Sequence, residues 1–403
     1  MANILGININ EINAGEAQKK IIAWLAGEES GYVVTPNPEI ILKARQDEEF
    51  FYILNKANLS VADGFGLKIA GWIMGEKIIR VTGSDLTISL LEEVARKNIK
   101  VVVLSWQAGL SSAIEIKTAL QTKFPDLQCL VIEVDREPAL KPDIIQAINN
   151  FSPQLLFSAL GFPYQEKIIY HNLKKMPSVK AALGVGGSFD FLTGRAKRAP
   201  RSFSFLGLEW LWRLIKQPRR FRRIFQATVV FLSAVLRARF ISRYRYRSNV
   251  ACLLYKNTPT GPQILITQRE DDDNHWQLPQ GETDGENIEK AGKRELKEEL
   301  NALSLKTTAV FKNVHRYKFA DRSKQLPSYY ETKKFKFDYK GQSQGLYIAE
   351  FLGDDSEIKI KFWDHVAWKW VPAEKLIESV HPVRQKGAQA FMQKFKSINL
   401  NSK

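Results

Sequence analysis

Three glutamates in the last third of the sequence have the types and spacing of a metal site. Glu295, Glu298 and Glu299 lie in the run RELKEE at 294–299. On a helix, positions i, i+3 and i+4 share one face, so the three carboxylates would stand together and repel one another. A hard divalent cation such as Mg²⁺ or Mn²⁺ binds oxygen ligands of this kind. The spacing alone also fits a solvated acidic stripe, because lysines are interleaved with the glutamates.

Polar clusters in the first half of the sequence form a second candidate constellation. They are TPNPE at 35–39, ADGFG at 62–66, RVTGSDL at 80–86, LGFPYQE at 160–166 and GVGGSFDFLTG at 184–194. Each cluster taken singly is typical of a turn, since Thr-Pro-Asn and Asp-Gly are common turn sequences. The amides of the GVGG run could also hold a diphosphate.

The elements around these clusters predict how they are positioned. Apolar runs that read as strands are Tyr32–Thr35, Lys100–Leu104, Leu127–Val134, Leu155–Ala159 and Ala181–Gly184. Helical patterns such as Leu86–Lys97 and Ser111–Lys123 alternate with them. This order predicts an α/β fold with a Rossmann-like, mostly parallel sheet and helices on both faces. Ligands of such folds bind beyond the carboxyl ends of the strands, where the polar clusters fall.

Composition sets broad limits on the class of protein. A length of 403 residues predicts two to three domains, and 44% apolar with 25% charged residues is typical of a globular protein. Two cysteines in unrelated settings exclude a disulfide framework and a cysteine zinc site. The first residues, MANILGININ, lack the basic and apolar regions of a signal peptide, so we expect a cytoplasmic protein.

The net charge of +16 is concentrated in one segment. Residues 195–247 contain 15 Lys or Arg and a single acidic residue, and their longest uncharged run, Ile224–Leu236, has 13 residues. A membrane-spanning helix needs about 20, so this segment is too short to span. Basic residues interleaved with aromatic and aliphatic ones are typical of a helix lying on an anionic membrane. A solvated basic face and a nucleic-acid site are alternative interpretations.

These changes in pattern divide the chain into three predicted parts. Residues 1–194 would form the first α/β domain, residues 195–247 a basic amphipathic appendage, and residues 248–403 a second domain of short strands, turns and one charged helix.

In order and spacing, the five clusters resemble the WecG/TagA/CpsF glycosyltransferase family from about residue 3 to about residue 225. The run GLEWLWRLIKQPRRFRR at 207–223 closely follows that family's C-terminal appendage. The resemblance implies inverting transfer from a UDP-sugar donor to an undecaprenyl-diphosphate-linked acceptor, with no required cofactor, in cell-surface polysaccharide synthesis. It also implies an appendage that docks on the anionic inner face of the cell membrane, which places the protein there peripherally.

The same resemblance assigns roles to residues. Asp63 would be the general base that deprotonates the acceptor hydroxyl. Thr35, Asn37 and Gln165 would position sugar hydroxyls. Arginines would neutralise the charge of the leaving UDP, namely Arg80, Arg213, Arg219 and Arg220. The glycine loop and a nearby aspartate would line the nucleotide pocket, namely Gly184, Gly186, Gly187 and Asp190.

The run WQLPQGETDGENIEKAGKRELKEELNA at 276–302 resembles the Nudix box. It is similar to the branch that hydrolyses dinucleoside polyphosphates or RNA 5′-pyrophosphates, with support from YKGQSQGLYIAEF at 339–351, WKWV at 368–371 and HPVRQ at 381–385. There are two departures. Gly281 lies one residue closer to Glu286 than in the pattern, and Asn301 replaces the final glycine, which Asn tolerates because it accepts positive φ.

This second resemblance implies an α/β/α sandwich with a mixed sheet and hydrolysis of a nucleoside-diphosphate-linked substrate. Glu295, Glu298, Glu299 and Asp364 would hold Mg²⁺ or Mn²⁺, and Glu299 or Glu298 would help to deprotonate the attacking water. Arg294 would pair with Glu286 to brace the loop after Gly281.

The sequence therefore predicts a bifunctional enzyme, a glycosyltransferase followed by a Nudix hydrolase, with no stable nucleic-acid partner. One alternative keeps the Nudix fold as a non-catalytic nucleotide sensor that regulates the transferase. The intact glutamates argue against it, and the short glycine loop supports it. Another alternative, an RNA-processing protein whose basic segment binds RNA, requires the five polar clusters to be inert.

Overall fold

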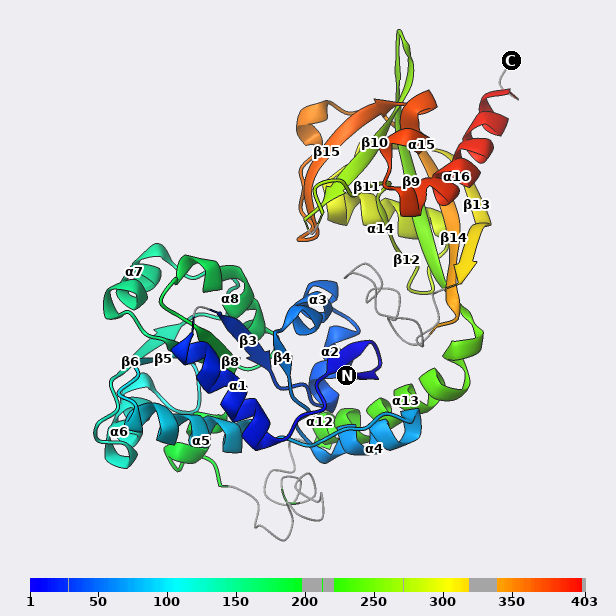
Figure 1. Ribbon diagram of the computed structural model, residues 1–403. Helices are drawn as coiled ribbons and strands as arrows, with labels where there is room; N and C mark the ends of the chain where they lie inside the picture. The colour runs from blue at the N-terminus through cyan, green and yellow to red at the C-terminus, as the bar shows by residue number, and fades with distance from the viewer. Residues whose placement is uncertain (28, 198–211, 213–220, 271, 319–338, 401–403) are drawn as a thin grey trace. The chain divides into compact units, whose positions relative to one another are not determined.

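The computed structural model describes residues 1–27, 29–197, 212, 221–270, 272–318 and 339–400 (Figure 1). The chain divides into two compact units, Met1–Arg239 and Phe240–Lys403. Each unit has its own sheet and its own apolar core, so each is described by itself.

The first unit contains a six-stranded sheet in which every neighbouring pair is parallel. The strand order is β4-β3-β8-β7-β5-β6. The strands are β3 (Gly31–Val34), β4 (Leu59–Ser60), β5 (Val101–Trp106), β6 (Cys129–Val134), β7 (Leu155–Ala159) and β8 (Ala181–Gly184). The predicted parallel α/β fold is confirmed.

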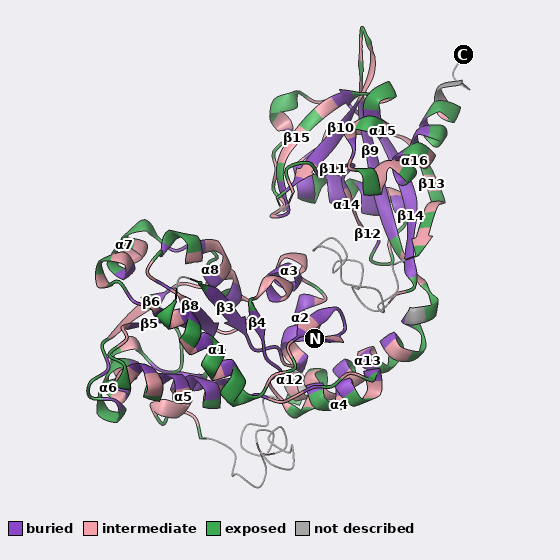
Figure 2. Cartoon of the chain, viewed as in Figure 1, coloured by how far each residue is buried: buried purple, intermediate pink, exposed green. Residues whose placement is uncertain are grey.

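Helices cover both faces of this sheet. Val101 and Val103 of β5 face one side of the sheet and belong to a core with the helices α1, α5 and α6. The alternate residues Val102 and Leu104 face the other side and are fully buried there. On that opposite face α8 packs on β7 and β8 (Figure 2). The helices are α1 (Ala14–Ala26), α2 (Pro38–Ala44), α3 (Glu48–Lys56), α4 (Phe65–Met74), α5 (Gly83–Arg96), α6 (Ala113–Lys123), α7 (Pro142–Phe151), α8 (Tyr164–Asn172) and α9 (Ser188–Leu192).

All five strands expected from the sequence of this unit are present, with ends that differ by at most two residues. Two features were missed. The edge strand β4 has only two residues, too few for a periodic signal, and β1 (Ala2–Ile4) and β2 (Ile7–Ile9) form a separate hairpin. The turn of that hairpin needs positive φ at Leu5 and Gly6, and leucine gives no turn signal.

Residues 221–240 of the basic segment are helical. The helix α12 (Phe221–Phe225) continues through a π-helical turn, η3 (Gln226–Val230), into α13 (Phe231–Phe240). This run contacts α2, and Gly66 of α4 lies beside the carbonyl of Ala227. Among the residues that the structure describes, no helix combines the length and the apolar character needed to cross a membrane.

The second unit contains a mixed seven-stranded sheet. Its main order is β11-β10-β9-β14-β13, with β12 paired to β9 and β15 paired to β10; β9 and β14 are parallel, and the other pairs are antiparallel. The strands are β9 (Tyr246–Thr258), β10 (Gly261–Arg269), β11 (Trp276–Gln277), β12 (Gln280–Glu282), β13 (Leu305–Lys318), β14 (Gly341–Phe351) and β15 (His365–Pro372). The predicted mixed sheet is confirmed.

Two helices cover opposite faces of this sheet. The helix α14 (Ile288–Leu300) packs on Val250, Cys252 and Leu254 of β9, and α16 (Pro382–Leu400) packs on the alternate residues Ala251 and Leu253. The short helix α15 (Leu376–Ser379) precedes α16. The strand β9 begins at Tyr246, so the domain boundary expected at residue 248 falls inside a strand.

Candidate active sites

The polar clusters of the first unit follow strands that are neighbours in its sheet. In the order β4-β3-β8-β7, these strands are followed by Asp63, by Thr35 and Asn37, by the Gly184–Gly187 loop, and by Gln165. All four strands are parallel, so their carboxyl ends lie at the same edge. Segments far apart in the sequence are therefore brought together at one edge of the sheet.

Thr35 and Asp63 converge on the first turn of α5. The amide of Asp63 donates to the Pro36 carbonyl at 2.8 Å, which ties the two loops together. A Cβ placed on Gly83 would lie 3.4 Å from Thr35 Cγ2 and 3.5 Å from Asp63 Oδ2. A threonine and a carboxylate thus face the same small space in front of a helix N-terminus.

Asn37 has a local structural partner. Its side-chain oxygen accepts the amide of Ile40 at 2.9 Å, so it caps the N-terminus of α2. This capping role explains the residue type without a ligand. The other end of the amide group, Nδ2, remains the part of Asn37 that could meet a sugar hydroxyl.

The side chain of Gln165 is fixed from both ends. Its Nε2 donates to Glu166 Oε1 at 2.7 Å, and its Oε1 accepts the amide of Gly186 at 2.9 Å. A Cβ on Gly184 would lie 2.7 Å from Gln165 Nε2, so glycine is required there for the amide group to fit. Gln165 thereby connects α8 to the glycine loop after β8.

Glu166 is a residue whose role the sequence analysis missed. Its side chain is fully buried, and its Oε2 makes no hydrogen bond. Burial raises the pKa of Glu166 to about 7. A glutamate beside a glutamine at the start of a helix gives no sequence signal of this, because the burial arises from tertiary packing.

Asp190 lies beside the glycine loop and also holds α9 in place. One carboxylate oxygen, Oδ1, accepts from the Ser111 hydroxyl at 2.7 Å, and a Cβ on Gly187 would lie 3.0 Å from Oδ2. The ordering contact comes from the loop after β5, which the sequence analysis did not connect with the site.

An arginine stacked between aromatic rings is a second missed feature. The Arg136 guanidinium lies 3.5 Å from the ring centroid of Trp106 and 5.3 Å from that of Tyr164. Its Nε donates to the Leu160 carbonyl at 2.8 Å. These residues lie at or just after the ends of β5, β6 and β7, so they extend the polar edge across the sheet. No local motif marks them.

The predicted phosphate-binding arginines divide into two groups. Arg80 forms a parallel bridge with Ala62, which places it next to the segment that carries Asp63. Arg213, Arg219 and Arg220, and most of the run at 207–223, lie outside the described residues.

In the second unit, Glu295, Glu298 and Glu299 all lie on α14. Glu295 and Glu299 are 7% and 3% exposed, so two charged side chains point into the protein. Gly281 of β12 makes room for one of them, because a Cβ there would lie 2.0 Å from the Glu295 carboxyl. Only glycine fits this position while Glu295 keeps its place.

Arg294 braces the loop between β12 and α14. Its guanidinium donates to Glu286 Oε2 at 2.9 Å and to the Glu282 carbonyl at 2.7 Å, so it bridges both ends of the short loop. The hydrogen bond from Arg294 lowers the pKa of Glu286 below its ordinary value. Arg294 also contacts Glu295 Oε1 at 2.7 Å and Glu298 Oε2 at 3.2 Å.

The chemistry of these carboxylates suits a hard divalent cation, although among the described residues the three glutamates do not form a group whose ligand atoms all lie within 4.8 Å of one another. They are oxygen donors, two of them are buried, and the Gly281 backbone leaves room for Glu295. Arg294 already shows that a positive charge is accommodated between Glu295 and Glu298.

The structure gives Asp364 a different partner from the one expected. Its Oδ2 accepts from Arg269 Nη1 at 2.8 Å, and both side chains are buried. Among the described residues, Asp364 does not gather with the α14 glutamates into a group of mutually close ligand atoms. Its pairing with Arg269, 95 positions away, could not be read from the sequence.

Comparison with known proteins follows the division into two units. Residues 2–245 match the model of the glycosyl transferase WecG/TagA/CpsF family, and residues 245–395 match the model of the NUDIX domain.

Individual relatives match the first part of the chain. The N-acetylglucosaminyldiphosphoundecaprenol N-acetyl-beta-D-mannosaminyltransferase of Bacillus spizizenii is 31% identical over 215 residues, which cover 53% of this chain and 82% of that protein. The enzyme of the same name from Staphylococcus aureus is 27% identical over 244 residues, which cover 59% of this chain and 92% of that protein.

Among solved structures, an Ap4A hydrolase complex from C. elegans aligns with 38% of this chain and 98% of its own, at 18% identity and a TM-score of 0.28.

Proposed function

We propose, from the premise that this chain belongs to the glycosyl transferase WecG/TagA/CpsF family and carries a NUDIX domain, that it catalyses two reactions. The first unit transfers a sugar, with inversion, from a UDP-sugar to a sugar on undecaprenyl diphosphate. The second unit hydrolyses a nucleoside-diphosphate-linked compound. The relatives named after an N-acetylglucosaminyldiphosphoundecaprenol acceptor support the choice of lipid-linked acceptor.

The observation that carries the transferase proposal is the meeting of Thr35 and Asp63 at Gly83, beside the loops that hold Gln165 and the glycines. Asp63 accepts the proton of the acceptor hydroxyl as that oxygen forms a bond to the anomeric carbon. The bond from the anomeric carbon to the diphosphate breaks at the same time, and UDP leaves with the electron pair. Attack on the face opposite the leaving group inverts the anomeric configuration.

Charge on the leaving diphosphate needs neutralisation. Arg80 enters from the segment adjoining Asp63, and the amides of the Gly184–Gly187 loop supply further donors. By the family resemblance, Arg213, Arg219 and Arg220 of the appendage complete this set. Asp190, with Oδ2 beside Gly187, faces the nucleoside part of the donor.

Glu166 acts as a positioning residue in this proposal. It holds Gln165 Nε2, and Gln165 Oε1 holds the Gly186 amide. The amide group of Gln165 then has one Nε2 hydrogen left for a sugar hydroxyl. A buried hydrogen-bonded chain of this kind fixes the loop before the donor arrives, which reduces the entropy lost on binding.

The lipid-linked acceptor requires the first unit to work at a membrane surface. The described helices of the basic segment expose Phe221, Phe225, Val229 and Leu236, and α13 carries arginines in its last turn. Apolar side chains next to arginines support a helix that lies in the interface of an anionic membrane.

For the second unit, Glu295, Glu298 and Glu299 would hold Mg²⁺ or Mn²⁺. When bound, the ion supplies positive charge that polarises the phosphoanhydride and acidifies water. Glu299 or Glu298 accepts the proton of the attacking water, and Arg294 keeps the loop after Gly281 closed on α14.

One experiment tests both assignments. The full chain is incubated with a panel of UDP-sugars and a short-chain N-acetylglucosaminyl-diphosphate lipid, and separately with dinucleoside polyphosphates and 5′-triphosphate RNA plus Mg²⁺. We expect release of UDP only when the lipid is present, and cleavage of at least one nucleotide. Failure to transfer from every UDP-sugar would contradict the first assignment. Binding without cleavage across the nucleotide panel would contradict the second.

A further inference from the structure

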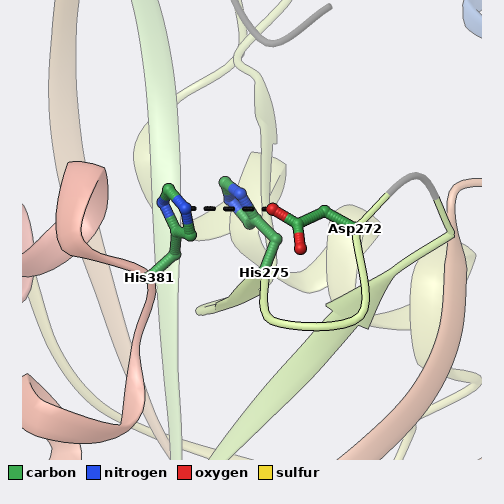
Figure 3. A group of neighbouring side chains, drawn as sticks. All are labelled: Asp272, His275 and His381. Carbon is green, nitrogen blue, oxygen red and sulfur yellow. Dashed lines mark ion pairs between the residues drawn. The ribbon is translucent and has the colours of Figure 1, made fainter. Parts of the chain in front are cut away.

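We infer that Asp272, His275 and His381 form a binding site for a divalent transition metal of the Zn²⁺ class, separate from the α14 glutamates. One ligand atom from each of the three side chains lies within 4.8 Å of the others (Figure 3). Among the described residues they are the only such group of histidine, cysteine and acidic side chains. The inference does not rest on either proposed reaction.

The backbone holds these residues together before any ion binds. Asp272 and His275 lie in the loop between β10 and β11, where the His275 amide donates to the Asp272 carbonyl at 2.9 Å. His381 lies just before α16, and its amide donates to the Trp276 carbonyl at 2.9 Å. Two segments far apart in the sequence are thus joined next to the three side chains.

The Asp272 carboxylate is oriented towards His381. Its Oδ1 accepts the amide of Asn274 at 2.9 Å, which fixes the side chain on its own loop. Its Oδ2 lies 3.9 Å from His381 Nε2, and this pair is marked by the dashed line in Figure 3. One oxygen therefore shapes the loop, and the other faces the imidazole.

Each imidazole has a neighbour that bears on its ligand atom. His275 is fully buried, and its Nε2 lies 3.3 Å from Gln277 Oε1; donation to this oxygen assigns the ligand role to Nδ1. His381 Nδ1 accepts the amide of Val383 at 3.3 Å. When Nε2 of His381 binds the metal, the ring proton must lie on Nδ1, so Nδ1 no longer accepts from the Val383 amide and that long contact is lost.

The donor set selects the class of metal. Two imidazole nitrogens and one carboxylate oxygen suit Zn²⁺ and its first-row neighbours, whereas Mg²⁺ and Ca²⁺ prefer oxygen ligands alone. The positive charge of two nearby arginines opposes the binding of any cation that is attracted by charge alone. Arg269 is paired with Asp364 at 2.8 Å, but Arg384, one turn after His381, is half-buried beside the group. The nitrogen ligands must therefore supply the affinity.

Binding requires a small closure. Zinc–ligand bonds of about 2.0–2.2 Å in a tetrahedral site place ligand atoms about 3.3 Å apart. In this structure Asp272 Oδ2 and His381 Nε2 are 3.9 Å apart and the ligand atoms of the group lie within 4.8 Å of one another, so they must approach, and the two stacked rings, at 13° and 4.3 Å between centroids, must tilt. Asp272 and His381 are partly exposed and can make this movement. Three protein ligands leave a fourth coordination position open.

The test measures Zn²⁺ binding to the full chain after chelator treatment, by equilibrium dialysis in metal-buffered solution with excess Mg²⁺ to occupy oxygen-only sites. We expect one Zn²⁺ per chain. Cobalt substitution should give the visible absorption of a four-coordinate site, and Zn²⁺ should raise the thermal midpoint of the second unit.

Asp272→Asn and His381→Asn should each weaken Zn²⁺ binding at least tenfold, while His315→Asn, a histidine of β13 outside the group, serves as the matched control. His275 is fully buried, so the two partly exposed residues are substituted instead. Circular dichroism of the metal-free variants checks that they fold. No Zn²⁺ bound by the wild type, or equal binding by the wild type and both variants, would overturn the inference.

Discussion

The two candidate active sites are built in opposite ways. The site of the first unit collects side chains from loops that follow four neighbouring strands. Its residues are spread along the sequence from Thr35 to Asp190. The site of the second unit lies within one run from Gly281 to Glu299. The first depends on strand order and the second on helical periodicity. A contiguous site can be recognised from a short motif, whereas a dispersed site is recognisable only when several weak motifs occur together.

Both sites nevertheless use a glycine to seat a functional side chain. Gly184 lies against the Gln165 amide, and Gly281 lies against the Glu295 carboxyl, so that an added Cβ would come within 2.7 Å and 2.0 Å of them. In the first unit the two partners come from different strand–helix units. In the second they are joined by a short loop that Arg294 bridges.

Separate chemistry in the two units predicts separate losses of activity. Asp63→Asn removes the proposed base and should lower sugar transfer by about 10²–10⁴, with UDP-sugar binding within a few-fold. Radiolabel transfer to lipid and a nucleotide-binding titration measure the two effects. Nucleotide hydrolysis in the same preparation should be unaffected. Wild-type transfer by this variant would remove Asp63 from the mechanism.

The converse loss is expected for Glu299→Gln. Hydrolysis should fall by about two or more orders of magnitude, because the variant lacks both a metal ligand and a proton acceptor. Chelator should abolish hydrolysis in the wild type. Transfer should survive both treatments, since the proposed transfer mechanism uses Asp63 and arginines and no metal. If chelator stops both reactions equally, the division of labour between the units is wrong.

A smaller loss should follow from crowding the contiguous site. Gly281→Ala pushes the Glu295 carboxyl aside, and a displacement of about 1 Å can cost about 10² in rate. Hydrolysis kinetics at saturating Mg²⁺ measure it. Gly387→Ala is the matched control, because its Cβ would meet its nearest atom at an ordinary 3.4 Å. Equal activity of both variants would show that Glu295 need not hold this position.

The dispersed site should respond to Glu166 more mildly. Glu166→Ala should raise KM for the UDP-sugar about tenfold, with a smaller change in kcat, because the Gly186 loop loses its brace. Glu166→Gln keeps an oxygen that accepts from Gln165 and should restore KM. A fall in kcat alone would point to a direct catalytic role instead.

The pH dependence of stability gives a second measure of Glu166. The pKa of Glu166 is raised from 4.5 to about 7 in the folded protein, so folding favours its protonated form. Its contribution to stability is present below the unfolded pKa and is lost as pH rises towards 7, by up to about 3 kcal/mol. The thermal midpoint of Glu166→Gln should therefore exceed that of the wild type increasingly between pH 5 and pH 8.

The smallest effects are expected for single residues of the basic segment. Each contacting Lys or Arg contributes about 1 kcal/mol to binding an anionic membrane, or about fivefold in affinity. Arg237→Gln and Arg239→Gln should each weaken binding to anionic vesicles by this factor, in a way that salt also weakens. Equal binding of the wild type to neutral vesicles would contradict the membrane proposal.

Local patterns predicted those features of the structure that local forces decide. The parallel sheet followed from alternating strand and helix signals, and Asn301 takes the positive φ of 57° expected at the end of α14. Features decided by tertiary packing were missed. Asp364 pairs with Arg269, and Arg136 stacks on Trp106, so both contacts join residues distant in the sequence. The burial of Glu166 likewise arises from tertiary packing.

The position of β9 has a mechanical consequence. The chain leaves α13 at Phe240 and enters the second unit through β9, which is an interior strand of the sheet and runs parallel to β14 from the pair Tyr246 and Gly341 onward. Extraction of β9 would have to break hydrogen bonds to neighbouring strands on both sides, whereas an edge strand is bonded to a neighbour on one side only. The second unit is thus tethered through an interior strand, which resists extraction better than an edge strand would.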